Sequence, residues 1–182
     1  MTIRIDPACA TCHVFTYKAG ALAALGHDLV FRLERFSFAL QDDVVEGHVE
    51  MDSLSLLGAC VNETAPEYTA FGRKDAERIM KTAKEILEPT RFPTARLRLT
   101  HPALALRDGP LDAQLTWRGA RRSVDGQMSV QGEEGLACFS IAQPAFGIRP
   151  FRAALGGLRI QPMVSVHVRF PLAPWNAAIR VE

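Results

Sequence analysis

Cys9, Cys12 and His13 are the residues whose types and spacing could most clearly carry chemistry. They form C-x-x-C-H, the pattern through which c-type haem is attached: two thiols bond to the porphyrin and the histidine ligates the iron. Haem attachment normally follows export, and the N-terminus lacks the long apolar core of a secretory leader. His13 also falls within an apparent strand, where such sites are unusual. A haem protein is therefore kept as an alternative.

The same two thiols could supply half of a zinc site. Structural zinc is held by four ligands, commonly from two pairs of closely spaced residues. The remaining cysteines, Cys60 and Cys138, are single and distant in the sequence. We therefore expect no metal site, no cofactor and mostly free thiols, and keep a metal-binding protein that uses Cys9, Cys12 and His13 as an alternative.

Histidines elsewhere in the sequence give weaker signals. His27 and Asp28 stand at a strand start, where they could form a polar gate for a ligand or a turn in which Asp28 caps backbone amides. His48, His101 and His167 stand on or beside strands among polar neighbours, which predicts isolated surface histidines. The sequence has no G-x-S-x-G, H-E-x-x-H or Gly-rich phosphate loop. We therefore expect a protein that is not an enzyme.

Length and composition favour one folded domain over residues 1–182. The chain has 182 residues, of which 48% are hydrophobic and 23% charged, which is ordinary for a globular protein. Its 21 basic and 20 acidic side chains give a net charge of +1, without the basic excess of nucleic-acid-binding proteins. No apolar run reaches the ~18 residues of a membrane span. We expect a cytoplasmic protein with no nucleic-acid partner and no integral membrane segment.

Alternation of apolar and polar residues dominates the chain and predicts β-strands. Over residues 29–40 the apolar phase slips by one residue at Glu34 and Arg35, which predicts a long strand with a bulge or bend. Further alternating segments cover residues 45–51, 95–99, 111–117, 124–130, 136–142 and 164–170. Short turns separate the strands from Leu111 onward, which predicts a meander of antiparallel neighbours.

One segment has helical periodicity. Over residues 74–87 an apolar stripe alternates with a charged face and ends before Pro89. The stripe consists of Ala76, Ile79, Met80, Ala83, Ile86 and Leu87. We expect it to pack against the sheet rather than form a cofactor site. With one helix and no alternation of strands and helices, a sandwich or a barrel remains.

Several short motifs resemble the YceI-like family. They are the helix end and aromatic-Pro-strand segment over 84–95, the Arg-Gly hairpin over 115–124, Met51-Asp52-Ser53-Leu54, and Phe146-Gly147-Ile148 with Gly157-Leu158-Arg159-Ile160 before the Val-rich final strand. The resemblance covers nearly the whole chain. It implies a lipocalin-like, closed antiparallel β-barrel of about eight strands, with the helix over about 74–87 packed against it. It brings no catalytic residues.

The resemblance also implies a ligand, because some family members hold an isoprenoid or quinone-type lipid in the barrel. We expect a carrier that binds such an apolar ligand, with a homodimer left open; a structural barrel plugged by its own side chains is the other alternative. The candidate ligand-binding residues are apolar strand positions: Phe15, Leu29, Phe31, Phe36, Phe38, Leu97, Leu99, Leu115, Trp117, Met128, Phe139, Val166 and Val168.

Overall fold

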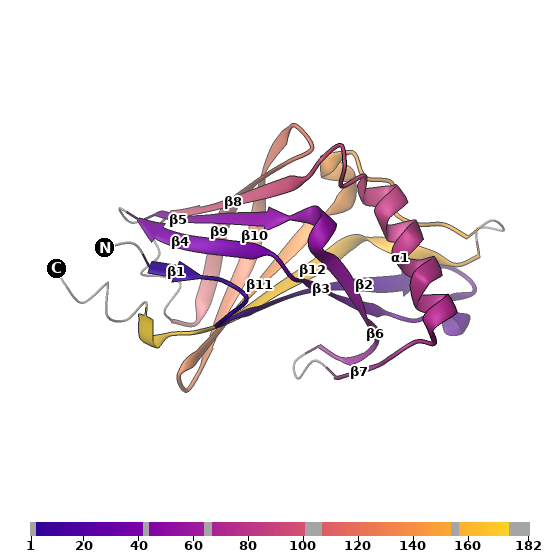
Figure 1. The fold of residues 1–182 in the computed structure, drawn as a ribbon, viewed down its shortest axis with the longest axis horizontal. Helices are drawn as coiled ribbons and strands as arrows, with labels where there is room; N and C mark the ends of the chain where they lie inside the picture. The colour runs from indigo at the N-terminus through magenta and orange to yellow at the C-terminus, as the bar shows by residue number, and fades with distance from the viewer. Residues whose placement is uncertain (1–2, 42–43, 64–66, 101–106, 154–156, 175–182) are drawn as a thin grey trace.

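The computed structural model describes residues 3–41, 44–63, 67–100, 107–153 and 157–174. Within these ranges the chain is mainly β, with one α-helix (Figure 1). The strands and the helix are β1 (Ile3–Ile5), β2 (Thr11–Ala19), β3 (Leu29–Leu33), β4 (Phe36–Gln41), β5 (Val44–Glu50), β6 (Leu54–Asn62), β7 (Glu67–Thr69), α1 (Arg73–Leu87), β8 (Thr94–Thr100), β9 (Gly109–Trp117), β10 (Ala120–Gln131), β11 (Glu134–Ala142) and β12 (Arg159–Pro171). Short 3-10 helices are η1 (Ala23–Leu25), η2 (Met51–Ser53) and η4 (Gln143–Phe146).

The strands form one antiparallel sheet that is curled into a half-barrel. Its order is β1-β4-β5-β8-β9-β10-β11-β12-β2-β3-β6-β7. Strands β8 to β12 are consecutive neighbours, so the predicted meander is confirmed. The predicted closed barrel of about eight strands is wrong, because the described sheet has twelve strands and its order ends at β1 and β7.

Two breaks in long strands, together with the short strands β1 and β7, account for the higher strand count. Glu34 and Arg35 separate β3 from β4, and η2 separates β5 from β6. As a result β4 pairs with β5, whereas β3 pairs with β6. Ser53 joins the two breaks: its buried hydroxyl accepts the Arg35 N–H at 3.0 Å and donates to the Glu50 carbonyl at 2.6 Å. The bend predicted at the phase slip is therefore confirmed.

Part of the inward face is closely packed by apolar side chains. Glycines at two inward positions make room for aromatic rings there. A Cβ atom on Gly47 would lie 2.6 Å from the Phe38 ring, and one on Gly126 would lie 2.7 Å from the Phe139 ring. Interiors are close-packed, so larger residues at these positions would displace the rings.

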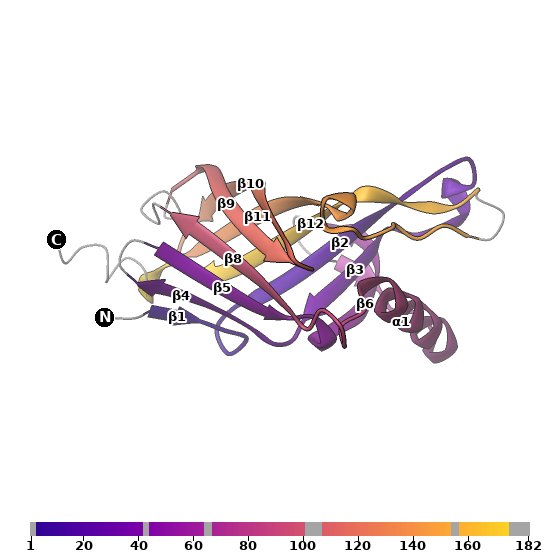
Figure 2. The same ribbon diagram turned by 90° about the horizontal axis from the view of Figure 1, so that it is seen from above.

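Helix α1 covers one end of the sheet and lies apart from it along much of its length (Figure 2). It begins one residue before the predicted start and ends at Leu87, followed by Glu88 in the left-handed conformation. Ile86 and Leu87 pack against the core, but no helix residue is fully buried. The expectation that the whole stripe packs against the sheet is therefore right only for the last turn.

Arg118 fixes that last turn to the sheet. Its guanidinium donates to the Leu87 carbonyl at 3.0 Å and to Glu88 Oε1 at 2.9 Å. The same group lies over the Phe92 ring, 4.1 Å from its centroid. The Arg118 hydrogen bond holds the pKa of the Glu88 carboxyl below its ordinary value. A positive φ of 51° at Arg118 places the side chain in the β9–β10 turn, facing the helix end.

Replacing Arg118 by Ala should lower the melting temperature by roughly 5 °C, because charge-assisted hydrogen bonds to the helix end are lost. Arg121→Ala is the matched control, since Arg121 is exposed and its side chain donates to Gln114 rather than to the helix. Thermal unfolding followed by circular dichroism measures both. Equal melting temperatures for the two variants would contradict the anchoring role.

Candidate functional site

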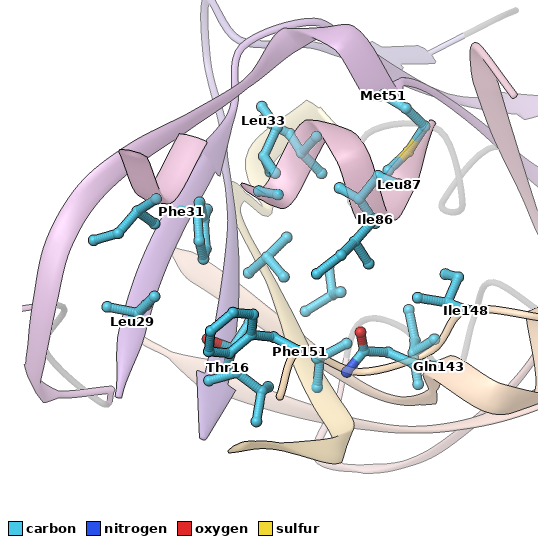
Figure 3. A pocket seen from close by; sticks show the side chains of 18 of the residues that line it. Thr16, Leu29, Phe31, Leu33, Met51, Ile86, Leu87, Gln143, Ile148 and Phe151 are labelled. Carbon is cyan, nitrogen blue, oxygen red and sulfur yellow. The ribbon is translucent and has the colours of Figure 1, made fainter. Parts of the chain in front are cut away.

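The candidate site is a cavity of about 710 Å³ between the open half of the sheet and α1. Side chains from β2, β3, α1, η2 and the segment after β11 point into one common space (Figure 3). Helix α1 contributes four of the six stripe residues, Ile79, Ala83, Ile86 and Leu87, of which the last two also pack against the core. The far wall contains Ile148 and Phe151. The space lies in the size range of small-molecule sites.

Nine of the thirteen candidate ligand-binding residues line this cavity. They are Leu29, Phe31, Phe38, Leu97, Leu115, Trp117, Phe139, Val166 and Val168. Four others, Phe15, Phe36, Leu99 and Met128, are buried elsewhere. Phe36, Leu99 and Met128 belong to the buried core and do not line the cavity, whereas other members of the same core, such as Leu115 and Phe139, also form the cavity wall. Strand periodicity predicts which face a residue takes, but not how far along the strand the packing extends.

Phe15 does not line the cavity for a different reason: it lies on the outer face of β2. Cys12, Val14 and Thr16 line the cavity, so the intervening residues point outward. Phe15 is only 1% exposed, and its ring lies 4.6 Å from that of His167. Each face of β2 carries both polar and apolar residues, so the alternation does not reveal which face points inward.

The lining is almost entirely apolar. Its charged members, Asp75 and Arg78, form an ion pair of 2.9 Å with each other at the exposed start of α1. The buried Thr16 Oγ1 and Trp117 Nε1 have no hydrogen-bond partner among the described residues, and neighbouring atoms cover them. Gln143 adds an amide that donates to the Gln161 carbonyl at 3.1 Å. A lining with few polar groups, whose two charged side chains pair with each other, suits an apolar ligand.

The C-x-x-C-H residues do not converge. Cys9 is exposed before β2, the Cys12 thiol lines the cavity, and His13 points to the outer face because successive strand residues alternate. Burial raises the pKa of the Cys12 thiol to about 12, so it stays protonated at neutral pH. No cluster of three or more metal-ligating side chains occurs in the described ranges. This geometry offers no common point for an iron or zinc ion.

The mouth of the cavity contains His27, whose ring packs edge-on against Phe71 at 5.5 Å. Asp28 accepts the Lys18 backbone N–H at 2.7 Å. Asp28 therefore caps a backbone amide, as the turn interpretation expected, and His27 is exposed at the mouth of the cavity. His48 is exposed, as expected. His167 was also expected at the surface, and this expectation is wrong because the residue is half-buried. His101 lies outside the described residues.

The sequence did not predict a polar cluster that lies on the outer face of β2 and β12. The Tyr17 hydroxyl lies 2.7 Å from Ser165 Oγ and donates to Glu63 Oε2 at 3.0 Å. His13 and His167 are direct cross-strand partners. Burial, then the charges of His13 and Arg169, lowers the pKa of His167 to about 4. Burial lowers the pKa of His13 as well. The cluster is brought together by pairing between distant strands, which sequence spacing does not reveal.

Because the pKa of His167 is lowered in this cluster, we expect the folded protein to lose stability in mild acid. An unfolded histidine titrates near pH 6.5, whereas folded His167 titrates near 4, so the unfolded state binds more protons in between. The free energy of unfolding should therefore fall as the pH drops from about 6.5 to about 4. Urea unfolding at several pH values measures it.

His167→Gln cannot take up the proton, so its stability should depend less on pH over the same interval. His48→Gln is the control, because His48 is exposed on β5. An equal pH dependence in the wild type and His167→Gln would refute the assignment.

No protein-family model matches the chain, and no curated protein sequence matches it either. Among solved structures, the chain is similar to BcnA of Burkholderia cenocepacia, with a TM-score of 0.53 and 12% sequence identity. The match covers 91% of this chain and 98% of BcnA. At this identity the similarity establishes a shared fold. No helix in the described ranges is long and apolar enough to cross a membrane.

Proposed function

We propose that this protein is a non-catalytic carrier that holds a long apolar ligand, such as an isoprenoid, a quinone-type molecule or another lipid, in the cavity beneath α1. The observation that supports the proposal is the apolar cavity of about 710 Å³ whose charged lining residues pair with each other at the mouth. A barrel plugged by its own side chains would leave no such space. The YceI-like motifs support the same ligand class.

Transfer of the ligand's apolar surface from water into the cavity provides enough free energy to bind it. Each buried CH₂ group contributes about 0.8 kcal/mol. About ten such groups therefore outweigh the several kcal/mol that binding a flexible chain costs. The one thiol in the lining, Cys12, is held protonated by a pKa of about 12, which makes it a poor nucleophile. Binding therefore accounts for the cavity without a reaction.

Ala83→Trp tests the proposal, because Ala83 lines the cavity from α1. The added indole should occupy ligand space and weaken binding of a fluorescent polyprenyl probe at least tenfold. The melting temperature should change little, since the helix is not tightly packed there. Fluorescence titration of delipidated protein and thermal unfolding give the two readings.

Lys84→Trp is the matched control: it is the next residue of α1, and its side chain is exposed and lies outside the cavity. It should leave probe affinity unchanged. Absence of probe binding in the wild type, or equal affinity in the wild type and Ala83→Trp, would refute the proposed carrier.

A further inference from the structure

The mouth of the cavity is formed by three chain segments with unusual surface chemistry. The mouth segments are residues 18–28 with η1, residues 70–78 at the start of α1, and the described residues 147–153 and 157–160. Each segment contributes side chains to the cavity lining. In both ribbon views these described residues lie toward the end of the molecule that is far from β1 (Figures 1 and 2).

Two leucines are exposed on the first mouth segment. Leu25 in η1 is 77% exposed and Leu22 is 46% exposed. They are held in place by the neighbouring segment, because the Leu22 N–H donates to the Gly157 carbonyl at 2.8 Å. Gly20 allows this close approach, since a Cβ atom there would lie 2.5 Å from the Gly157 oxygen. The fold thus presents two apolar side chains to solvent beside the cavity.

The mouth segments are also strongly basic. They contain seven Lys or Arg residues and three Asp or Glu residues, a surplus of four positive charges in a chain whose total is +1. Arg152 and Arg159 are direct partners in an antiparallel bridge, which places two like charges side by side. Neither they nor Lys74 form an ion pair with a described residue. An external anionic surface would relieve this repulsion.

We propose that the mouth segments dock on the surface of an anionic lipid membrane. Leu22 and Leu25 would insert into the boundary between headgroups and acyl chains, while Arg152, Arg159 and Lys74 contact lipid phosphates. Exposed apolar residues rimmed by cations are typical of proteins that lie on a membrane surface. Docking in this orientation places the cavity mouth against the bilayer, so an apolar ligand moves between them without crossing water. The biological purpose rests on the proposed carrier function, but the docking itself does not.

Sedimentation with vesicles of phosphatidylcholine and phosphatidylglycerol (1:1) at low salt tests the docking, using delipidated full-length protein. Vesicles of phosphatidylcholine alone should bind far less protein. Arg152→Ser with Arg159→Ser should weaken binding to the anionic vesicles roughly 30-fold, since each basic residue near such a surface contributes about a fivefold change in affinity. Leu22→Ser with Leu25→Ser should weaken it at least tenfold.

Matched controls separate this surface from general charge and hydrophobicity. Arg96→Ser with Arg98→Ser removes the same charge from exposed positions on β8, and Val61→Ser removes an exposed apolar side chain from β6. Both should bind almost as the wild type does, with circular dichroism confirming that every variant is folded. Ala83→Trp should also bind vesicles normally, which separates docking from ligand binding. Equal binding to both vesicle types, or equal losses in the mouth variants and their controls, would overturn the proposal.

Discussion

The structure depends on one constraint. The curled sheet has a wide apolar inner face, and its own side chains do not fill the space that this face partly encloses. Toward the end away from α1, the Phe38 and Phe139 rings pack over Gly47 and Gly126 and also form part of the cavity wall. At the other end the sheet continues, but no second layer of sheet covers it among the described residues. An amphipathic helix covers that end and leaves a space beneath it. Fold and cavity therefore follow from the same apolar inner face.

The bends and the helix anchor determine the shape of this space. The breaks at Glu34–Arg35 and at η2 redirect β3 and β6 away from β4 and β5, which allows the sheet to curl. Arg118 fixes the C-terminal turn of α1, whereas the N-terminal turns lie at the mouth with the ion pair of Asp75 and Arg78. The helix is thus firmly held at one end and solvent-exposed at the other. That asymmetry places the opening of the cavity beside η1.

Local patterns predicted the strands, the meander, the bend and α1 well, because each depends on residues close in the sequence. The sheet closure was wrong because it depends on which segments pair after a break, as for β3 with β6. Leu115, Phe139 and Met128 share a face and all belong to the core, yet only Leu115 and Phe139 also line the cavity, a difference that the alternation does not contain. The alternation does not assign Phe15 to a face, because each face of β2 carries both polar and apolar residues. The polar cluster around His167 could not be foreseen, since β2 and β12 pair across most of the chain.

The central claim is that the cavity beneath α1 is a ligand site rather than unfilled space. Extraction of the purified protein into organic solvent, followed by mass spectrometry, tests it most directly. The account predicts an apolar long-chain compound at close to one molecule per protein in the wild type, and a much lower content in protein whose cavity is occupied by the Ala83→Trp indole. A wild-type extract free of any stoichiometric lipid, from protein that also fails to take up added polyprenyl probe, would contradict it.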